Sequence, residues 1–357
     1  MQDDIITAQE YFKGRGAQIN TANRFLKQVY VTEHIEGLDE PLMSNERTKY
    51  FYEYPKQIVN KVKSPDLPMM YSMNPYQGCE HGCAYCYARN VHTYWGFSAG
   101  LDFERKIIIK PEAPQLLEKT FMQASWQPNT IMLSGNTDCY QPIERKMMLT
   151  RKMLEVCLNF RNPVGVISKN SLVLRDKDIL QELAKLNLVR VMISLTTLDE
   201  NLRQLMEPRT ATAFKRLQVI EELNAAGIPC GVMTAPTIPG LNSDEIPSLL
   251  KAAAERGAIA AGYTLVRLNG DVKEIFRNWL YHNFPDRAAK VWNLIMQCHG
   301  GEVNDSKFGR RMRGDGNVAQ SIAQLFKLSV KKYFKDNKPA EVNTSLFRRP
   351  YGQMSLF

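Results

Sequence analysis

Three cysteines stand close together in one short segment, CEHGCAYC, as Cys79, Cys83 and Cys86. The next cysteine along the chain is Cys139, so no fourth thiol is nearby. Clustered thiols in a reducing compartment are more often metal ligands than disulfide partners. The seven cysteines are also an odd number with uneven spacing, which does not fit a disulfide framework. The segment therefore predicts a metal centre with three protein thiolates.

Zinc and an iron–sulfur cluster place different demands on such a loop. Structural zinc sites use four protein ligands, commonly as two separated pairs of Cys or His. Cys83 and Cys86 resemble one such pair, and His81 or His92 would have to supply more ligands. A four-iron cluster held by three thiolates leaves one iron open to a substrate or cofactor. In that interpretation the missing fourth cysteine is the functional feature.

Strand-like and helix-like runs alternate from Tyr71 onward. Each strand-like run is short and rich in β-branched or apolar residues, as strands buried on both faces are. The runs are 72–76, 130–135, 164–168, 189–195, 228–234 and 260–266, and helices are expected at 143–160, 176–186, 212–226 and 243–256. This alternation predicts an α/β protein with parallel βα units in a whole or partial barrel, or alternatively an open doubly wound sheet. In both architectures ligands bind at the carboxyl ends of the strands.

The composition is that of an ordinary globular protein. Hydrophobic residues make up 44% and charged residues 23%, so the composition indicates neither a disordered chain nor a coiled coil. No run approaches the roughly 18–20 apolar residues of a spanning helix, and the start, MQDDIITAQE, is unlike a signal peptide. We therefore expect a cytoplasmic protein with no membrane partner. The expected parts are an N-terminal extension wrapped on the surface (1–68), a barrel (69–270), a C-terminal helical region (271–345) and a flexible tail (346–357).

Basic charge gathers toward the end of the chain. The net charge is +9, and residues 301–357 hold eleven Lys or Arg against five Asp or Glu. This clustering predicts a polyanionic partner, nucleic acid before membrane, because no amphipathic insertion pattern accompanies it. In the segment KFGRRMRGDG we expect phosphate contacts from Lys307, Arg310, Arg311 and Arg313, since its glycines allow close backbone approach. A solvated basic loop is the alternative.

The cysteine spacing, with the aromatic Tyr85 just before the last cysteine, resembles the signature of the radical S-adenosylmethionine (SAM) superfamily. Other segments are similar to its spore photoproduct lyase-like branch, often labelled DNA repair photolyases. These segments are GNTDCYQPIE, ISKN, ISLTTLD, MEPRT and APTIPGLN, while GRGA, NRF and TSLFRRP resemble one subgroup of that branch. The resemblance implies a partial (β/α)6 TIM-like barrel with a [4Fe–4S] cluster that reductively cleaves SAM to a 5′-deoxyadenosyl radical. It further implies lyase-type repair of a pyrimidine lesion in DNA, with an electron donor such as flavodoxin or ferredoxin.

The resemblance also assigns roles to individual positions. Cys79, Cys83 and Cys86 would ligate the cluster, and Tyr85 would line the adenine side of SAM. The other SAM contacts implied by position are Asn136, Thr137, Asp138, Lys169 and Ser194. The segment GNTD departs from the family's usual Gly-Gly-Glu-Pro, so several oxygens are candidates for binding the SAM amino group.

Spore photoproduct lyases quench the product radical with a cysteine thiol, and the resemblance implies such a hydrogen-atom donor here. Cys139 follows the second strand on the catalytic rim and is the expected donor. Cys157 and Cys230 fall inside a helix and a strand, where buried apolar cysteines are common. Cys298 lies among helices whose position the sequence does not fix.

The last five residues, QMSLF, resemble the bacterial sliding-clamp-binding peptide. Gln353 would fix the register, and Leu356 and Phe357 would enter a hydrophobic pocket of the clamp. Docking of Phe357 into its own domain is the alternative. Clamp binding would connect the chain to DNA independently of the lyase resemblance.

Two other functions stay open at the level of the sequence. The same radical chemistry on RNA or on a protein would be favoured by a tail without clamp affinity. A non-catalytic iron–sulfur or zinc protein that binds nucleic acid would show no SAM cleavage.

Overall fold

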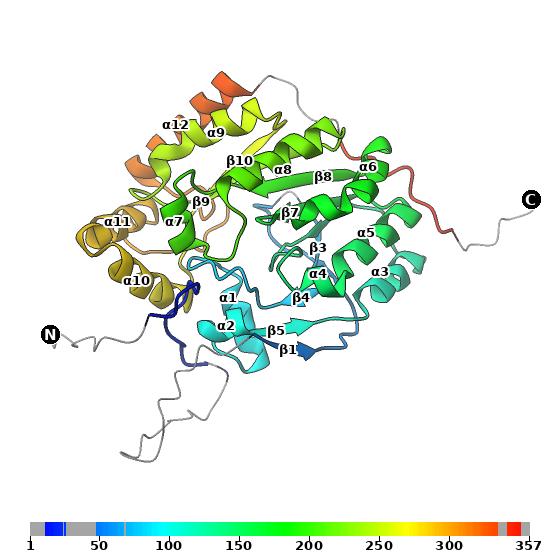
Figure 1. The fold of residues 1–357 in the computed structure, drawn as a ribbon, viewed down its shortest axis with the longest axis horizontal. Helices are drawn as coiled ribbons and strands as arrows, with labels where there is room; N and C mark the ends of the chain where they lie inside the picture. Colours follow the sequence, from blue (N-terminus) through cyan, green and yellow to red (C-terminus); the bar gives the residue numbers. More distant parts are fainter. Residues whose placement is uncertain (1–10, 24, 26–47, 68, 335–340, 351–357) are drawn as a thin grey trace, which may run out of the picture.

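The computed structural model describes residues 11–23, 25, 48–67, 69–334 and 341–350. Its main sheet has seven strands in the order β10-β9-β8-β7-β6-β3-β2. They are β2 (Val59–Lys61), β3 (Tyr71–Met73), β6 (Ile131–Leu133), β7 (Val164–Ser168), β8 (Val189–Ser194), β9 (Cys230–Thr237) and β10 (Ala261–Leu265). β2 pairs with β3 in the antiparallel sense, and the other neighbouring strands are parallel. Figure 1 labels β3, β7, β8, β9 and β10 of this sheet.

The strand order decides between the two architectures that the sequence allowed. An open doubly wound sheet reverses its strand order at a switch point. In this sheet each parallel strand lies next to the one that follows it in the main sheet, as in a barrel wound in one direction. The prediction of a partial (β/α)6 barrel is confirmed, and the doubly wound alternative is wrong.

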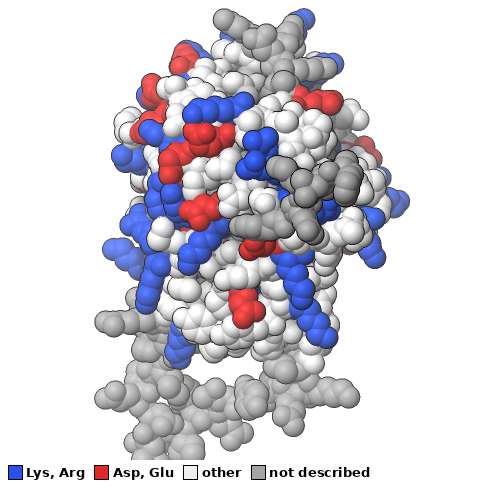
Figure 2. Space-filling view, turned by 90° about the vertical axis from the view of Figure 1, so that its right-hand side faces the viewer, with Lys and Arg blue, Asp and Glu red and all other residues white. Residues whose placement is uncertain are grey.

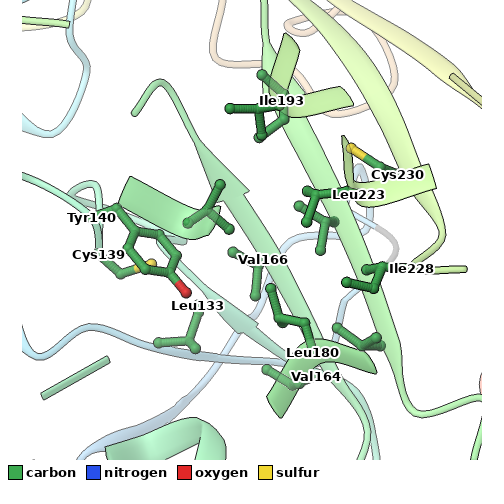
Figure 3. Close-up of a cluster of buried hydrophobic side chains, with 14 of the residues drawn as sticks. Leu133, Cys139, Tyr140, Val164, Val166, Leu180, Ile193, Leu223, Ile228 and Cys230 are labelled. Atoms are coloured by element: carbon green, nitrogen blue, oxygen red, sulfur yellow. The ribbon is translucent and has the colours of Figure 1, made fainter. Parts of the chain in front are cut away.

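The helices that alternate with these strands pack on the outer face of the sheet. They are α3 (Ala113–Met122), α5 (Leu149–Phe160), α6 (Lys177–Lys185), α8 (Ala213–Ala225) and α9 (Ile246–Glu255). Leu133, Val166 and Ile193 belong to the core formed with this layer, together with Leu180 of α6 and Leu223 of α8 (Figure 3). Because side chains alternate along a strand, the residues between them face the concave side of the barrel, where many are partly exposed.

The single helix expected over 143–160 is interrupted. The chain forms α4 (Glu144–Met147) before α5, and Met148 between them has a φ of 54°. This left-handed backbone breaks the helical ladder. It also lets the buried carboxylate of Glu144 accept a hydrogen bond from the Thr150 amide (3.1 Å) at the start of α5, which satisfies one of the donors that a helix start leaves free.

A three-stranded sheet, with strand order β1-β5-β4, lies beside the cysteine loop. Its strands are β1 (Lys49–Tyr52), β5 (Lys106–Ile109) and β4 (Tyr76–Gln77), and the nearby helices are α1 (Arg89–His92), η1 (Thr93–Trp95) and α2 (Leu101–Arg105). Because β4 ends two residues before Cys79, this small sheet fixes where the cysteine loop begins.

Further helices complete the barrel. They are η2 (Ser171–Asp176), α7 (Glu200–Met206), η3 (Ser243–Glu245), α10 (Val272–Asn283), α11 (Pro285–Cys298) and α12 (Gly316–Tyr333). The apolar stripe expected on α12 (Val318, Ile322, Leu325, Phe326 and Val330) packs against the core, and the Phe326 ring lies 4.5 Å from the Tyr263 ring of β10. Among the described helices, none combines the length and the apolar character needed to cross a bilayer.

Residues 341–350 lie at the edge of the barrel where strands begin. The Arg348 amide donates to the carbonyl of Phe160 (2.9 Å), and the Arg349 guanidinium donates to the carbonyl of Phe121 (3.1 Å). These carbonyls lie in the last turns of α5 and α3, the helices that precede β7 and β6 along the chain. Figure 2 shows this side, where basic and acidic side chains are interspersed. The predicted tail residues Gln353, Leu356 and Phe357 lie outside the described residues.

Candidate active site

The cysteine loop follows β4 and folds into tight turns. Gly82 has a φ of 68°, a left-handed conformation that glycine adopts at little cost. The Cys79 amide donates to the carbonyl of Phe103 (2.9 Å), and the Cys86 amide donates to that of Cys83 (3.3 Å). Cys79 and Cys83 are buried, and Cys86 is partly buried. Backbone hydrogen bonds therefore hold the three cysteines in one compact loop.

The three thiols suit a cluster better than a single ion. Burial raises the pKa of each thiol, that of Cys83 to about 12, so iron must displace the thiol protons when it binds. In the part of the chain that the structure describes, no three His, Cys, Asp or Glu side chains lie close enough to share one metal ion. A four-iron cluster does not require this, because each cysteine binds a different iron. The loop therefore fits a [4Fe–4S] cluster held by three thiolates.

The zinc alternative needed a histidine, and His81 is already engaged. Its Nδ1 lies 3.4 Å from the carboxylate of Asp138, and its Nε2 lies 3.2 Å from the side-chain amide of Asn170. His92 is fully buried and contacts the ring of Phe103. This geometry does not favour zinc.

Asp138 connects the cysteine loop to β7. Its carboxylate accepts hydrogen bonds from the Ser168 hydroxyl (2.9 Å) and the Lys169 amide (2.8 Å), and it faces His81. Burial alone would raise the pKa of Asp138, but His81 and the backbone amides of Lys169 and Tyr140 lower it to about 2. Both carboxylate oxygens are thus used within the protein, and contact with SAM stays a prediction for this residue.

The side chains of the two residues before Asp138 differ in whether they keep an unused hydrogen-bond acceptor. The Thr137 hydroxyl is buried and donates to the carbonyl of Tyr76 (2.6 Å). Asn136 is partly exposed, and its side-chain amide donates to Gln77 (3.0 Å). The Oδ1 of Asn136 accepts no hydrogen bond from the described residues. Of the three residues predicted from GNTD, Asn136 therefore offers an unused acceptor.

Lys169 and Ser194 lie at the carboxyl ends of the adjacent strands β7 and β8. The Lys169 ammonium lies 6.0 Å from the centre of the Tyr85 ring and forms no ion pair with the described residues. Burial opposes its charge, but Cys83 and Glu207 raise the pKa of Lys169 above its usual value. Ser194 is buried, and no described residue bonds its hydroxyl. A charged lysine and a hydroxyl at this rim can bind a carboxylate.

Glu207 is a buried residue that sequence reasoning left without a role, although the segment MEPRT contains it. Its carboxylate accepts hydrogen bonds from the hydroxyls of Tyr85 and Thr196 and from the Arg216 guanidinium. Burial alone would raise the pKa of Glu207, but Arg216 and Lys169 lower it to about 2. Tyr85, predicted to line the adenine side of SAM, is thereby fixed through its hydroxyl. The sequence signal that could have identified Glu207 was that it is the only acidic residue in the MEPRT segment.

A second buried glutamate, Glu104, ties the N-terminal segment to the cysteine loop. It accepts hydrogen bonds from Arg89 (2.5 Å) and from two backbone amides of the GRGA segment (2.8 and 3.3 Å). A side chain at Gly16 would lie 1.7 Å from the carbonyl oxygen of Gly82. Residues 15–17 are buried rather than wrapped on the surface as expected. This segment is therefore part of the wall around the cysteine loop.

On the concave face of the barrel, methionine side chains pack against glycines of the neighbouring strands. Three methionines each lie across from a glycine on the next strand, and a side chain on any of these glycines would meet the methionine at under 3 Å. The pairs are Met132 with Gly165, Met192 with Gly231 and Met233 with Gly262. Methionine is flexible and polarizable, so this face offers an apolar and adaptable surface below the rim.

Cys139 is fully buried in the core, beside Leu133 and Tyr140 (Figure 3). Burial raises its pKa well above the usual value, as it does for Cys157 and Cys230. This placement does not favour Cys139 as hydrogen-atom donor, because a donor must reach the product radical. The role stays a prediction.

Residues 307–316, here called the basic loop, lie at the same edge of the barrel as the cysteine loop. The Leu265 amide at the end of β10 donates to the carbonyl of Met312 (3.0 Å) and so fixes its position. Arg310 pairs with Asp305 and Asp315, and Arg311 pairs with Asp66. Lys307 and Arg313 form no ion pair with the described residues, and Arg313 lies over the Tyr263 ring at 5.1 Å. Of the four predicted phosphate contacts, two are therefore committed to internal pairs.

Comparison with known proteins gives a family and a fold. The model of the radical SAM superfamily matches residues 73–253. The chain is 32% identical over 242 residues to an uncharacterized protein of Mycobacterium bovis, covering 67% of this chain and 71% of that protein. It is 26% identical over 238 residues to an uncharacterized protein of Methanocaldococcus jannaschii, covering 67% and 85%.

The fold is similar to that of a solved spore photoproduct lyase complexed with dinucleoside spore photoproduct. The TM-score is 0.59 at 14% identity, over 80% of this chain and 79% of that chain. A mutant of that lyase with bound AdoMet gives a TM-score of 0.55 at 14% identity, over the same shares. With three thiols in a compact loop at the rim of a partial barrel and a family match over half of its length, the chain belongs to the radical SAM superfamily, whose members use a [4Fe–4S] cluster and SAM.

Proposed function

We propose that this chain is an enzyme that starts radical chemistry on DNA and reverses a pyrimidine lesion in a lyase-type reaction. Cys79, Cys83 and Cys86 would hold the cluster, which would supply the electron for reductive cleavage of SAM to the 5′-deoxyadenosyl radical. Lys169 would pair with the SAM carboxylate, and the Oδ1 of Asn136 would accept a hydrogen bond from the SAM amino group. The observation that carries the proposal is a three-thiol loop whose Tyr85 ring lies 6.0 Å from the Lys169 ammonium, which forms no ion pair with the described residues.

Two features support DNA as the substrate. Lys307 and Arg313 stand on the basic loop at the carboxyl-end edge, where phosphate contacts would present a nucleotide to the rim. The fold is also that of a lyase solved with dinucleoside spore photoproduct. A small acidic electron carrier such as flavodoxin or ferredoxin supplies the electron, and the reaction takes place in the cytoplasm.

The test is to reduce the reconstituted chain without oxygen, in the presence of SAM and ultraviolet-irradiated DNA. We expect 5′-deoxyadenosine and restored pyrimidines, both detected by mass. Undamaged DNA and RNA serve as parallel substrates, and turnover of RNA alone would reassign the substrate. A fully iron-loaded chain that cleaves no SAM would contradict the enzyme itself. Lys307→Gln with Arg313→Gln should weaken DNA binding, while Lys185→Gln on α6 should not.

We also propose that the QMSLF segment binds a bacterial sliding clamp. Residues 341–350, which precede it, lie on the edge opposite to the cysteine loop, so a clamp held there would leave the catalytic rim accessible. Removal of residues 353–357 should abolish clamp binding without changing SAM cleavage. Equal clamp binding by both chains would contradict this proposal and leave the reaction untouched.

A further inference from the structure

Three arginines that the proposed reaction does not use meet beside the cysteine loop. Arg15 is 2% exposed, and Arg105 and Arg209 are partly buried. The Arg209 guanidinium donates to the carbonyl of Gly14 (3.2 Å), and the Arg105 guanidinium lies 4.7 Å from the centre of the Phe12 ring. Arg15, Arg105 and Arg209, here called the arginine cluster, come from distant parts of the chain and converge on one N-terminal segment.

Arg15 Nη1 donates to the carbonyl of Glu104 (3.0 Å), but three other donor nitrogens of the arginine cluster lack acceptors. The Nε of Arg15 and the Nε and Nη2 of Arg105 are buried and make no hydrogen bond within the described residues. Native proteins rarely leave such donors without a ligand, ion or water. Burial, followed by the charges of Arg209 and Arg105, lowers the pKa of Arg15 to about 10, so it stays charged at neutral pH. Arg15 therefore does not lose its proton at neutral pH, and its buried donor without an acceptor still costs free energy.

The nearby carboxylates are already occupied. Glu104 accepts hydrogen bonds from Arg89 and from two backbone amides of the GRGA segment. Glu80 accepts hydrogen bonds from the Ile143 amide (3.2 Å) and from the Tyr50 hydroxyl (3.4 Å). The arginine cluster thus carries more positive charge and more donors than the surrounding residues satisfy.

We propose that the arginine cluster is a binding site for a phosphate-type oxyanion. Guanidinium groups present parallel N–H donors that match phosphate oxygens, and the unpartnered nitrogens of Arg15 and Arg105 supply such donors. Inorganic phosphate and a phosphodiester group of a nucleic acid share this chemistry. The site is distinct from the three cysteines and from Lys169, and its ligand is bound whether or not SAM is cleaved.

The test is a calorimetric titration of the full chain with sodium phosphate, with sodium chloride at equal ionic strength as reference. A short single-stranded oligodeoxynucleotide forms the second arm. We expect saturable binding in at least one arm, weakened about tenfold by Arg105→Gln, because one charge-assisted contact is lost. The Arg105 guanidinium bonds no described residue, so this variant should fold. Arg256→Gln, on the distant end of α9, is the matched control and should bind as the wild type does.

The titrations with phosphate and with the oligodeoxynucleotide distinguish the possible ligands of the site. Loss of oligodeoxynucleotide binding in Arg105→Gln, without phosphate binding by the wild type, assigns the site to a phosphodiester, whereas loss in both arms assigns it to phosphate groups in general. Equal binding by the wild type and Arg105→Gln, or no saturable binding in either arm, would overturn the proposal. If Arg105→Gln does not fold, as judged by circular dichroism, Arg209→Gln replaces it with the same expected loss.

Discussion

Two buried glutamates hold the cysteine loop, and their partners differ. Glu104 is bound by Arg89 and by backbone amides of the GRGA segment. Glu207 is bound by Tyr85, Thr196 and Arg216. Both carboxylates are fully buried, and removing the cationic partner of a buried carboxylate is strongly destabilising.

The two networks differ in role. The Glu104 network holds the backbone of the cysteine loop, whereas the Glu207 network lies beside the residues that we expect to contact the ligand. The Glu104 network ends in backbone amides and closes on itself, which fixes the path of the chain. The Glu207 network includes Tyr85 and influences Lys169, whose ammonium lies over the Tyr85 ring. We infer that damage to the first network loosens the cysteine loop, whereas damage on the Lys169 side weakens SAM binding first.

The largest effect is expected when one of the three predicted cluster ligands is removed. Cys83→Ala should reduce 5′-deoxyadenosine formation to background and lower the iron content, because two thiolates do not hold the cluster. Cys157→Ala, in a core helix, should keep both. Full iron content with unchanged SAM cleavage in Cys83→Ala would contradict the assignment of the loop.

The next effect concerns the Glu207 network. Glu207→Gln leaves the buried Arg216 without its counter-charge and should destabilise the fold by about 4 kcal/mol at pH 7 in urea unfolding. Glu182→Gln on the surface should change stability by under about 0.5 kcal/mol. A shift as small as that of this control would show that Glu207 is not a structural charge.

The same variant carries a pH dependence. The pKa of Glu207 falls from its ordinary 4.5 to about 2 in the folded state. A carboxylate with a lowered pKa stabilises the fold above its unfolded value and loses this contribution as the pH falls toward the folded value. As the pH falls from about 5 to about 2, the free energy of unfolding of the wild type should therefore fall more steeply than that of Glu207→Gln.

A somewhat smaller effect is expected from the Glu104 side. Gly16→Ala places a methyl group on the carbonyl of Gly82, and the backbone shift should cost about 3 kcal/mol and lower the iron content. Gly14→Ala is the matched control: it meets no atom within 4 Å and has only its φ of 77° to oppose it, a cost of about 1 kcal/mol. If both variants retain iron equally, the segment does not brace the loop.

The smallest effect tests the ligand-facing side. Lys169→Met should weaken SAM binding about tenfold, through loss of one charge-assisted contact, and leave the iron content unchanged. Equilibrium binding of SAM to the loaded chain measures this, with Lys185→Met on the surface of α6 as control. Loss of iron in Lys169→Met would instead place Lys169 with the structural residues.

Much of this arrangement could be predicted from the sequence because its signals are local. The six parallel strands appear as short apolar runs, and the strand predicted at 164–168 is β7 itself. Lys169 and Ser194 were implied by the resemblance to the lyase family, and the structure places both at the carboxyl ends of strands, where ligands bind in such folds. The break at Met148 was missed, because apolar periodicity continues through a single left-handed residue.

The networks around the loop could not be predicted. Glu104 lies 88 residues from Gly16, and Arg311 lies 245 residues from Asp66. No local pattern records such pairings, because they form only when the barrel brings these segments together. The same holds for the basic loop, in which pairing to aspartates leaves Lys307 and Arg313 as the cations without an ion pair among the described residues.

The sequence by itself determined the three-thiol loop, the order of the βα units and the strand ends at which we expect ligands to bind. These depend on spacing and periodicity, which neighbouring residues fix. Only the tertiary structure decided which carboxylates are consumed by internal partners and which cations are left for ligands. The physical reason is that burial makes every charge depend on its nearest partner in space, whatever their separation along the chain.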